Sequence, residues 1–181
     1  GFMNEMIAAE RNNKIKFTVQ YGTRLSRCSM MAKNAIDDGK LGKILMGKVD
    51  VMWYREQSYY DSGEWRGTWA GERGGATFHH GRYAIDLYLW LMGEVSEVYA
   101  QMDTFTHKIE IEDCSMSVLR FKHGALGQIT ASTSAHPGIA PSQRIEIFGE
   151  KAAISVIPNW NIGSSDENYA AQLKKELEAE V

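Results

Sequence analysis

The sequence has few cysteines: Cys28 and Cys114 are the two among 181 residues, and they lie far apart without a Cys-x-x-Cys spacing. A disulfide framework or a zinc site is therefore not expected, and the sequence indicates two reduced cysteines in a cytoplasmic protein. Runs of basic residues are also missing, and the net charge is −3. Binding to nucleic acid or to an anionic membrane is therefore not expected.

Long apolar runs are missing as well, so no transmembrane helix is expected. The first five residues, Gly-Phe-Met-Asn-Glu, lack the basic and apolar regions of a signal peptide. What is present is an ordinary globular composition, with 44% hydrophobic and 24% charged residues. This length and composition are sufficient for one domain with a hydrophobic core.

The first part of the chain reads as a helix over residues 2–11 followed by a strand over residues 15–21. A helix followed directly by a strand is typical of a parallel α/β sheet. One helix and one strand cannot form such a sheet, so the chain is expected to begin inside a domain whose earlier units are absent. A further helix is predicted from Ser26, its N-cap, to about Asp38.

The rest of the chain predicts an α+β fold, with one large, mostly antiparallel open sheet and helices on one face. Because such a sheet leaves its other face open, we expect a homo-oligomer formed through that face. The predicted elements are a strand over 42–53 with a bulge at Gly47-Lys48, a long loop over 56–76, a helix over 80–92 closed by Gly93, strands near 95–105, 114–121, 125–133, 143–149 and 152–157, and a final helix over 164–180.

Side chains with acid–base chemistry meet a glycine-rich turn near the start of the helix predicted at residue 80. They are His79, His80 and Tyr83. His79 and Tyr83 are four residues apart and would share one face of a helix. A histidine can accept or donate a proton near neutral pH. Two other interpretations stay open: the histidines cap the helix while Tyr83 packs, or they bind a metal, although no third ligand has a suitable spacing.

The segment before this turn, residues 53–69, is rich in aromatic residues and arginine, including Trp65 and Arg66. Aromatic faces stack on sugar rings, and arginine donates hydrogen bonds to hydroxyls or carboxylates. A packed loop or an oligomer contact would have the same composition, so both interpretations stay open. Asp86, among apolar neighbours in its helix, is expected to hold a structural hydrogen bond.

Several segments, in order over about residues 3–157, resemble the family of glucose-fructose oxidoreductase, inositol dehydrogenase and MocA. The resemblance implies a Rossmann domain followed by an α+β domain with a large open sheet. Residues 1–22 would then be the last helix and strand of the dinucleotide-binding domain, and residues 23–181 the substrate-binding and oligomerisation domain. The matching segments are Val19-Gln-Tyr-Gly-Thr-Arg24, Ile36–Ile44, Trp65-Arg66, Gly74–Gly93, Ile111–Gly127 and Arg144–Gly149.

The resemblance also implies the site. In family dehydrogenases the positions of His79 and Tyr83 carry Asp or Asn and His, so these two are the candidates for proton handling. Tyr21 and Arg24 match positions near the nicotinamide and the substrate. The remaining candidates, which would shape the substrate cleft, are Trp65, Arg66 and His80.

The function that the resemblance implies is hydride transfer between NAD or NADP and a sugar, polyol or related metabolite. The cofactor would be bound mainly by the N-terminal domain, whose Gly-x-Gly-x-x-Gly turn is not in this sequence. Without that turn, the chain alone is expected to be inactive. Two alternatives stay open: an NAD-dependent glycosidase of the same family, and a non-catalytic sugar-binding module, since both usual acid–base positions are substituted.

Overall fold

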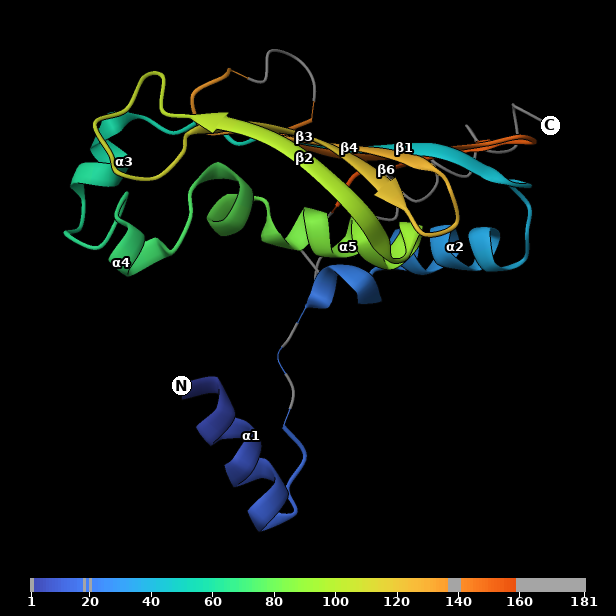
Figure 1. Ribbon diagram of the computed structural model, residues 1–181, viewed down its shortest axis with the longest axis horizontal. Coiled ribbons are helices and arrows are strands. Elements are labelled where there is room, and N and C mark those ends of the chain that lie inside the picture. The colour runs from blue at the N-terminus through green and yellow to red at the C-terminus, as the bar shows by residue number, and fades with distance from the viewer. Residues whose placement is uncertain (1, 18, 20, 137–140, 159–181) are drawn as a thin grey trace.

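The computed structural model describes residues 2–17, 19, 21–136 and 141–158. Helix α1 (Phe2–Asn13) lies apart from the sheet and its helices (Figure 1). The short 3-10 helix η1 (Gly22–Leu25) leads into α2 (Arg27–Asp37). The later helices are α3 (Gln57–Asp61), α4 (Trp69–Glu72), the π-helical turn η2 (Ala76–His80) and α5 (Arg82–Met92). No helix among these described residues is long and apolar enough to cross a membrane.

The described strands form one six-stranded sheet in the order β2-β3-β4-β1-β5-β6. Strands β1 and β4 pair in parallel, whereas the other neighbours pair antiparallel. The predicted α+β class with a mostly antiparallel sheet is therefore confirmed. The strands are β1 (Ile44–Met52), β2 (Val95–Asp103), β3 (Cys114–Phe121), β4 (Leu126–Ser132), β5 (Gln143–Gly149) and β6 (Ala153–Val156).

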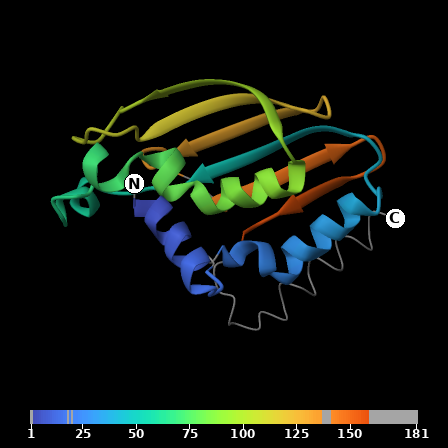
Figure 2. The ribbon, with the colours of Figure 1, turned by 60° about the horizontal axis from the view of Figure 1, so that its bottom comes forward.

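Helices α2 and α5 cover one face of the sheet (Figure 2), as predicted. Leu87, Tyr88 and Leu91 of α5 are buried in the core between this helix and the sheet. The Tyr88 hydroxyl donates a 2.8 Å hydrogen bond to the carbonyl oxygen of Gly47, and burial raises the pKa of Tyr88. Burying one large apolar side chain stabilises a fold by about 1.5–3 kcal/mol, so α5 is firmly anchored.

The ends of the two covering helices follow their sequence signals. The Ser26 hydroxyl caps α2 by accepting a hydrogen bond from the Ser29 N–H at 3.2 Å. Gly39, with φ of +69°, follows the end of α2, and Gly93, with φ of +89°, ends α5. The helices predicted from Ser26 to Asp38 and over 80–92 are thus confirmed, although α5 itself begins at Arg82.

Three local predictions are wrong. The segment 56–76 is not one long loop but contains α3 and α4, whose few residues are too short to show helical periodicity. The described residues of 15–21 form no strand, because no described strand lies beside them to share hydrogen bonds. The bulge of β1 falls between Ile44 and Met46 rather than at Gly47-Lys48, and it faces β5. The final helix predicted over 164–180 lies outside the described residues.

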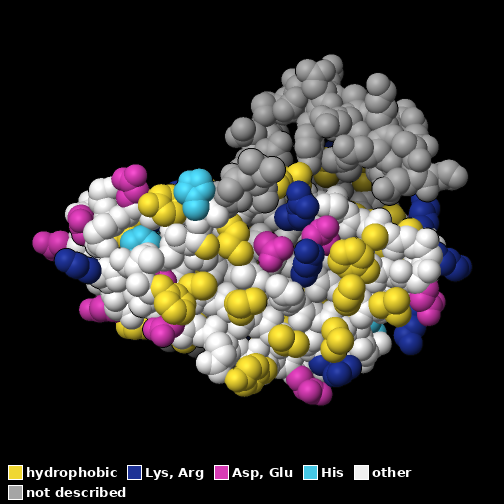
Figure 3. Space-filling model, turned by 90° about the horizontal axis from the view of Figure 1, so that it is seen from above, with side chains coloured by type: hydrophobic (Ala, Val, Ile, Leu, Met, Phe, Trp, Pro, Cys, Tyr) yellow, Lys and Arg dark blue, Asp and Glu magenta, His cyan; other side chains and the backbone are white. Residues whose placement is uncertain are grey.

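The face of the sheet that α2 and α5 leave free is partly apolar. Figure 3 looks onto this face and shows hydrophobic side chains interspersed with charged ones. Strand register places Tyr99 beside Val118, and Leu126 beside Met46. Each of these four side chains is at least 47% exposed. We call these four residues, together with Met116 and Phe148, the outer sheet face.

Candidate active site

A single glutamate fixes the glycine-rich turn that precedes α5. The Glu112 carboxylate accepts hydrogen bonds from the backbone N–H of Gly75 at 2.8 Å and of Thr77 at 3.1 Å. Its carbonyl oxygen accepts a third from the Ala76 N–H at 3.0 Å. A Cβ atom at position 75 would lie 1.7 Å from that carbonyl oxygen, so this close approach requires glycine. The path of the chain into η2 is therefore set by Glu112.

The π-helical turn η2 carries His79 and His80 at its end. Such turns occur frequently at functional sites. The two imidazole rings meet edge to face with 4.9 Å between centroids, and the ring of Trp65 lies 6.1 Å from that of His79. The side chain of His79 is 21% exposed, whereas His80 as a whole is 8% exposed. His79 is therefore the histidine that a ligand can reach.

A buried carboxylate lies beside His79. Glu72 Oε1 is 3.5 Å from His79 Nε2, and the Glu72 side chain is completely buried. Glu72 Oε2 accepts a hydrogen bond from the Gly67 N–H at 2.9 Å, whereas Oε1 has no hydrogen-bond partner among the described residues. Because an incompletely paired buried carboxylate is costly, this arrangement favours a proton on the histidine nitrogen that faces it.

Burial and neighbouring charges shift the pKa of His79 in opposite directions. Burial lowers the pKa of His79, and the Glu72 carboxylate acts against that shift. The guanidinium charges of Arg82, Arg66 and Arg55 lower the pKa further. The balance keeps the imidazole neutral and able to accept a proton at neutral pH.

His80 differs from its neighbour because it is nearly enclosed. Burial lowers the pKa of His80 to about 3, and the charges of His79 and of the arginines already named add to the shift. The Nε2 atom of His80 is buried without a hydrogen-bond partner among the described residues. His80 therefore stays uncharged at physiological pH.

Tyr59 of α3 connects the histidines to the arginine-rich segment. Its ring lies 5.7 Å from that of His80. The guanidinium carbons of Arg55 and Arg66 lie 4.9 Å and 4.2 Å from the centre of the same ring. Arg66 also lies 4.5 Å from the centre of the Trp65 ring. The predicted aromatic and arginine residues are thus brought together with the histidines, and they form one wall of the site.

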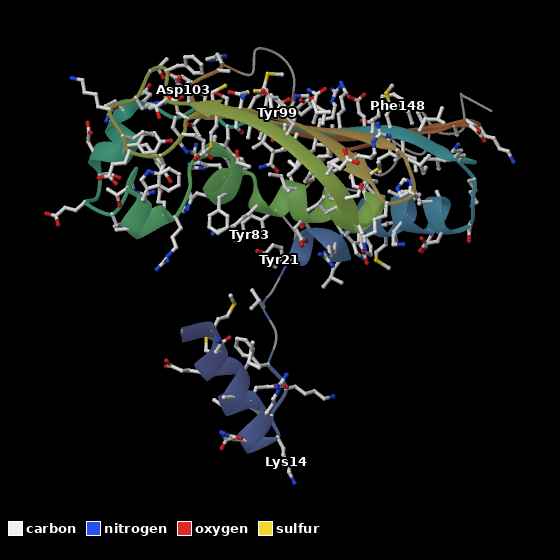
Figure 4. The ribbon with its side chains drawn as sticks, in the orientation of Figure 1. Lys14, Tyr21, Tyr83, Tyr99, Asp103 and Phe148 are labelled. Atoms are coloured by element: carbon white, nitrogen blue, oxygen red, sulfur yellow. The ribbon has the colours of Figure 1, made fainter. Side chains whose placement is uncertain are left out.

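Tyr83 belongs to a second cluster at the start of α5. Its ring lies 5.4 Å from that of Tyr21, and the two are adjacent in Figure 4. Arg24 donates two hydrogen bonds to Asp86, at 2.7 Å and 2.5 Å, which confirms the structural role predicted for Asp86. His79 lies in the π turn and Tyr83 in α5, so the α-helical spacing assumed for this pair does not hold.

Sequence reasoning missed both glutamates of the site. Glu72 stands two residues before Gly74, and a carboxylate next to a glycine-rich turn was the signal that could have indicated it. Glu112 lies 37 residues beyond Gly75, and no local pattern connects the two.

The described residues include a depression beside Arg66 but no metal-binding cluster. Within the part of the chain that the structure describes, no group of three or more His, Cys, Asp or Glu side chains could hold a metal ion. An open depression of about 600 Å³ adjoins Arg66 and is lined by residues 66–68, 104 and 107–110. Of the candidate site residues, Arg66 alone lines this depression.

Comparison with known proteins finds two dehydrogenases that this chain resembles. Levoglucosan dehydrogenase from Pseudarthrobacter phenanthrenivorans is 24% identical over 174 residues, which cover 82% of this chain and 44% of that protein. The WlbA dehydrogenase from Bordetella pertussis, solved with NADH and UDP-GlcNAcA, has a TM-score of 0.77 and 35% identity. That match covers 84% of this chain and 45% of the WlbA chain. The chain thus spans about half the length of these relatives.

A structure of levoglucosan dehydrogenase with NADH and levoglucosan matches with a TM-score of 0.70 and 26% identity, over 78% of this chain and 40% of that one. The family model described as the GFO/IDH/MocA C-terminal domain matches residues 30–155, which span the α+β fold from α2 to β6. The chain therefore belongs to the Gfo/Idh/MocA family and carries its C-terminal domain.

Proposed function

We propose that the protein to which this chain belongs transfers a hydride between NAD or NADP and a hydroxyl-bearing carbon of a sugar, polyol or related metabolite. The observation that carries the proposal is His79, a partly exposed imidazole beside a buried carboxylate in the turn before α5. The relatives add support, because WlbA and levoglucosan dehydrogenase were both solved with NADH and a sugar-containing ligand.

We place the nicotinamide end of the cofactor at the start of α5. The ring pair of Tyr21 and Tyr83 offers an aromatic surface at the start of α5. The Gly-x-Gly-x-x-Gly turn that carries the pyrophosphate in dinucleotide-binding domains is not in the sequence. We assign residues 1–22 to the end of the dinucleotide-binding domain and residues 23–181 to the substrate domain, because the C-terminal domain model matches from residue 30 onward. Exposed apolar side chains at Met3, Phe17 and Val19 support a larger partner surface for this first part.

Proton handling is the task that we assign to His79. The bound nicotinamide supplies the hydride acceptor or donor. Glu72 favours the tautomer of His79 that carries its proton on Nε2, which leaves the Nδ1 lone pair to accept a proton from the substrate hydroxyl. The imidazolium so formed is stabilised by the buried carboxylate, in the way that a carboxylate orients the histidine of a catalytic triad. A positioned general base of this kind contributes about 10²–10⁴-fold to a rate.

The other candidates keep supporting roles in this proposal. Tyr83 is the second group for proton handling, and it lies with Tyr21 and Arg24 on the cofactor side. Trp65 offers a ring face to a sugar, next to His79. Two further residues shape the cleft: Arg66 through its charge and His80 by packing against Tyr59.

The proposal is tested first by NADH and NADPH fluorescence titrations on this chain and on the complete reading frame. Tight binding by the long form alone is expected. In that form, His79→Ala should lower turnover at least about a hundredfold, whereas His136→Ala, in an exposed loop, should not. If neither form binds a nicotinamide cofactor, the oxidoreductase proposal fails and sugar binding without redox chemistry replaces it.

We also propose that the outer sheet face binds a second copy of the protein. Apolar side chains gather there without a covering helix, and such a face is commonly hidden by self-association.

A further inference from the structure

We infer that the substrate carries an anionic oxygen group, a carboxylate or a phosphate, and that Arg55, Arg66 and Arg82 bind this group beside His79. The inference rests on the proposed function and names the class of substrate for the same site: an acidic rather than a neutral sugar or polyol.

These arginines have no acidic partner among the residues that the structure describes. None of the three forms an ion pair within the described residues. Arg24, by contrast, is paired with both oxygens of Asp86. Arg55 donates one hydrogen bond, to the carbonyl oxygen of Tyr54 at 3.3 Å. Its Nε is buried and has no acceptor among the described residues, which is costly for a charged group.

The three guanidinium groups lie near the histidine pair. Arg55 and Arg66 both lie over the ring of Tyr59, and that ring contacts His80. Arg82 begins α5, three residues after His79. All three guanidinium charges lower the pKa of His79 and of His80, so each lies within electrostatic range of the imidazole pair.

Positive charge outweighs negative charge around His79. Among the charges that shift the pKa of His79, the Glu72 carboxylate opposes the three guanidinium groups. Its Oε2 atom already accepts a hydrogen bond from Gly67, and its side chain is fully buried, so it cannot turn to pair with an arginine. The wall of the site therefore keeps an excess of positive charge that a neutral sugar would leave without a partner.

Aromatic rings hold the guanidinium groups in place. Arg66 lies 4.2 Å from the centre of the Tyr59 ring and 4.5 Å from that of Trp65, and Arg82 lies 4.8 Å from that of Tyr83. Nη2 of Arg82 already donates a hydrogen bond to the Tyr83 hydroxyl at 3.4 Å, but stacking on a ring leaves the rest of the N–H edge of a guanidinium free for hydrogen bonding. That edge matches the two oxygens of a carboxylate or phosphate, and charge-assisted pairs of this kind are the stronger hydrogen bonds in proteins.

Isothermal titration calorimetry of the complete reading frame, saturated with NADH, tests the inference with matched sugars. Glucuronate is compared with glucose, galacturonate with galactose, and glucose 6-phosphate with glucose. At least one acidic sugar should bind about tenfold more tightly, or better, than its neutral counterpart, and the difference should shrink as salt is added.

Three variants assign the effect: Arg55→Gln, Arg66→Gln and Arg82→Gln should each reduce the preference for the acidic sugar. Arg120→Gln is the matched control, because Arg120 is exposed at the end of β3, whereas η2 contacts the start of that strand at Ser115. Arg120 donates to the Gly124 carbonyl oxygen instead. Thermal unfolding of every variant separates a loss of binding from a loss of folding. If Arg55→Gln does not fold, the other two variants carry the test.

The outcomes are distinct. A preference for glucose 6-phosphate identifies phosphate as the bound group, and a preference for a uronate identifies carboxylate; both support the inference. Equal affinity within every pair, no binding by any acidic probe, or a preference that survives all folded arginine variants overturns it. Acidic sugars that bind but reduce neither NAD⁺ nor NADP⁺, when these replace NADH, refute the proposed redox function alone, whereas turnover confined to neutral sugars refutes the inference alone.

Discussion

The Nε2 atom of His79 lies 3.5 Å from Oε1 of Glu72, and the imidazole is 21% exposed where the carboxylate is completely buried. A buried negative charge next to a reachable imidazole favours the protonated imidazole more than an exposed carboxylate would, because water screens it less. The pair therefore couples the protonation of His79 to a group that a ligand cannot reach.

The substitution Glu72→Gln should lower the pKa of His79. The amide keeps an oxygen to accept the Gly67 hydrogen bond, but it removes the charge that opposes burial and the neighbouring arginines. The measurement is an NMR titration of the His79 ring nitrogens. Glu64→Gln, in the exposed part of the same segment, is the control and should leave the titration unchanged. An unchanged or raised pKa of His79 in Glu72→Gln would show that the carboxylate does not act on it.

His80 should make the fold sensitive to mild acid. Its pKa falls to about 3 in the folded protein, against about 6.5 in an unfolded chain. Between these values the unfolded state binds more protons, so the free energy of unfolding should decrease as the pH falls from about 6.5 towards 3. Urea unfolding at pH 7, 5.5 and 4.5 measures this slope. His80→Gln has no proton to bind and should show a shallower slope; equal slopes in the two proteins would contradict the assignment.

Glu112 should contribute substantially to the free energy of unfolding, although it lies outside the helices and strands. In Glu112→Ala, the N–H groups of Gly75 and Thr77 lose their acceptor, at a cost of about 1–3 kcal/mol for each buried group. Glu112→Gln keeps one acceptor oxygen and should lose less. Urea unfolding of both variants gives the comparison. A Glu112→Ala protein as stable as the wild type would mean that water replaces the carboxylate.

Much of the fold could be predicted because its signals are local. The strands predicted over 114–121 and 143–149 match β3 and β5, and Gly93 marked the end of α5. Helix α4 was missed because contacts distant in sequence hold it: the Glu110 carboxylate accepts a hydrogen bond from the Trp69 N–H at 3.0 Å. Nearby, the Tyr60 hydroxyl at the end of α3 bonds to Thr133 at 2.8 Å.

The site was predictable only in part, for a related reason. Residue types and the glycine-rich turn indicated His79 and His80 as candidates, but not which of the two is reachable. That difference arises from burial, and burial depends on elements far along the chain. The role of Glu72 depends equally on the fold, since six residues of sequence separate it from His79 and only the turn at Gly74-Gly75 brings the two side chains together.

The outer sheet face provides the last prediction, which is that Val118→Lys in the complete reading frame should convert an oligomer to a smaller species. Val118 is 57% exposed and pairs in register with Tyr99, which Figure 4 shows on the side of the sheet opposite to Tyr83. A lysine in the middle of a buried apolar interface would leave an unpaired charge there and weaken association. Light scattering coupled to gel filtration measures the mass.

Val98 is the matched control for this experiment. It is also an exposed valine, at 66%, but its register partner is the buried Leu119, so it points to the helix side of the sheet. Val98→Lys should therefore leave the mass unchanged. A wild-type protein that is monomeric at every concentration, or a Val118→Lys protein of unchanged mass, would refute the proposed interface. Loss of mass in Val98→Lys instead would place the contact along the edge strand β2, whose unpaired backbone groups can also join two sheets.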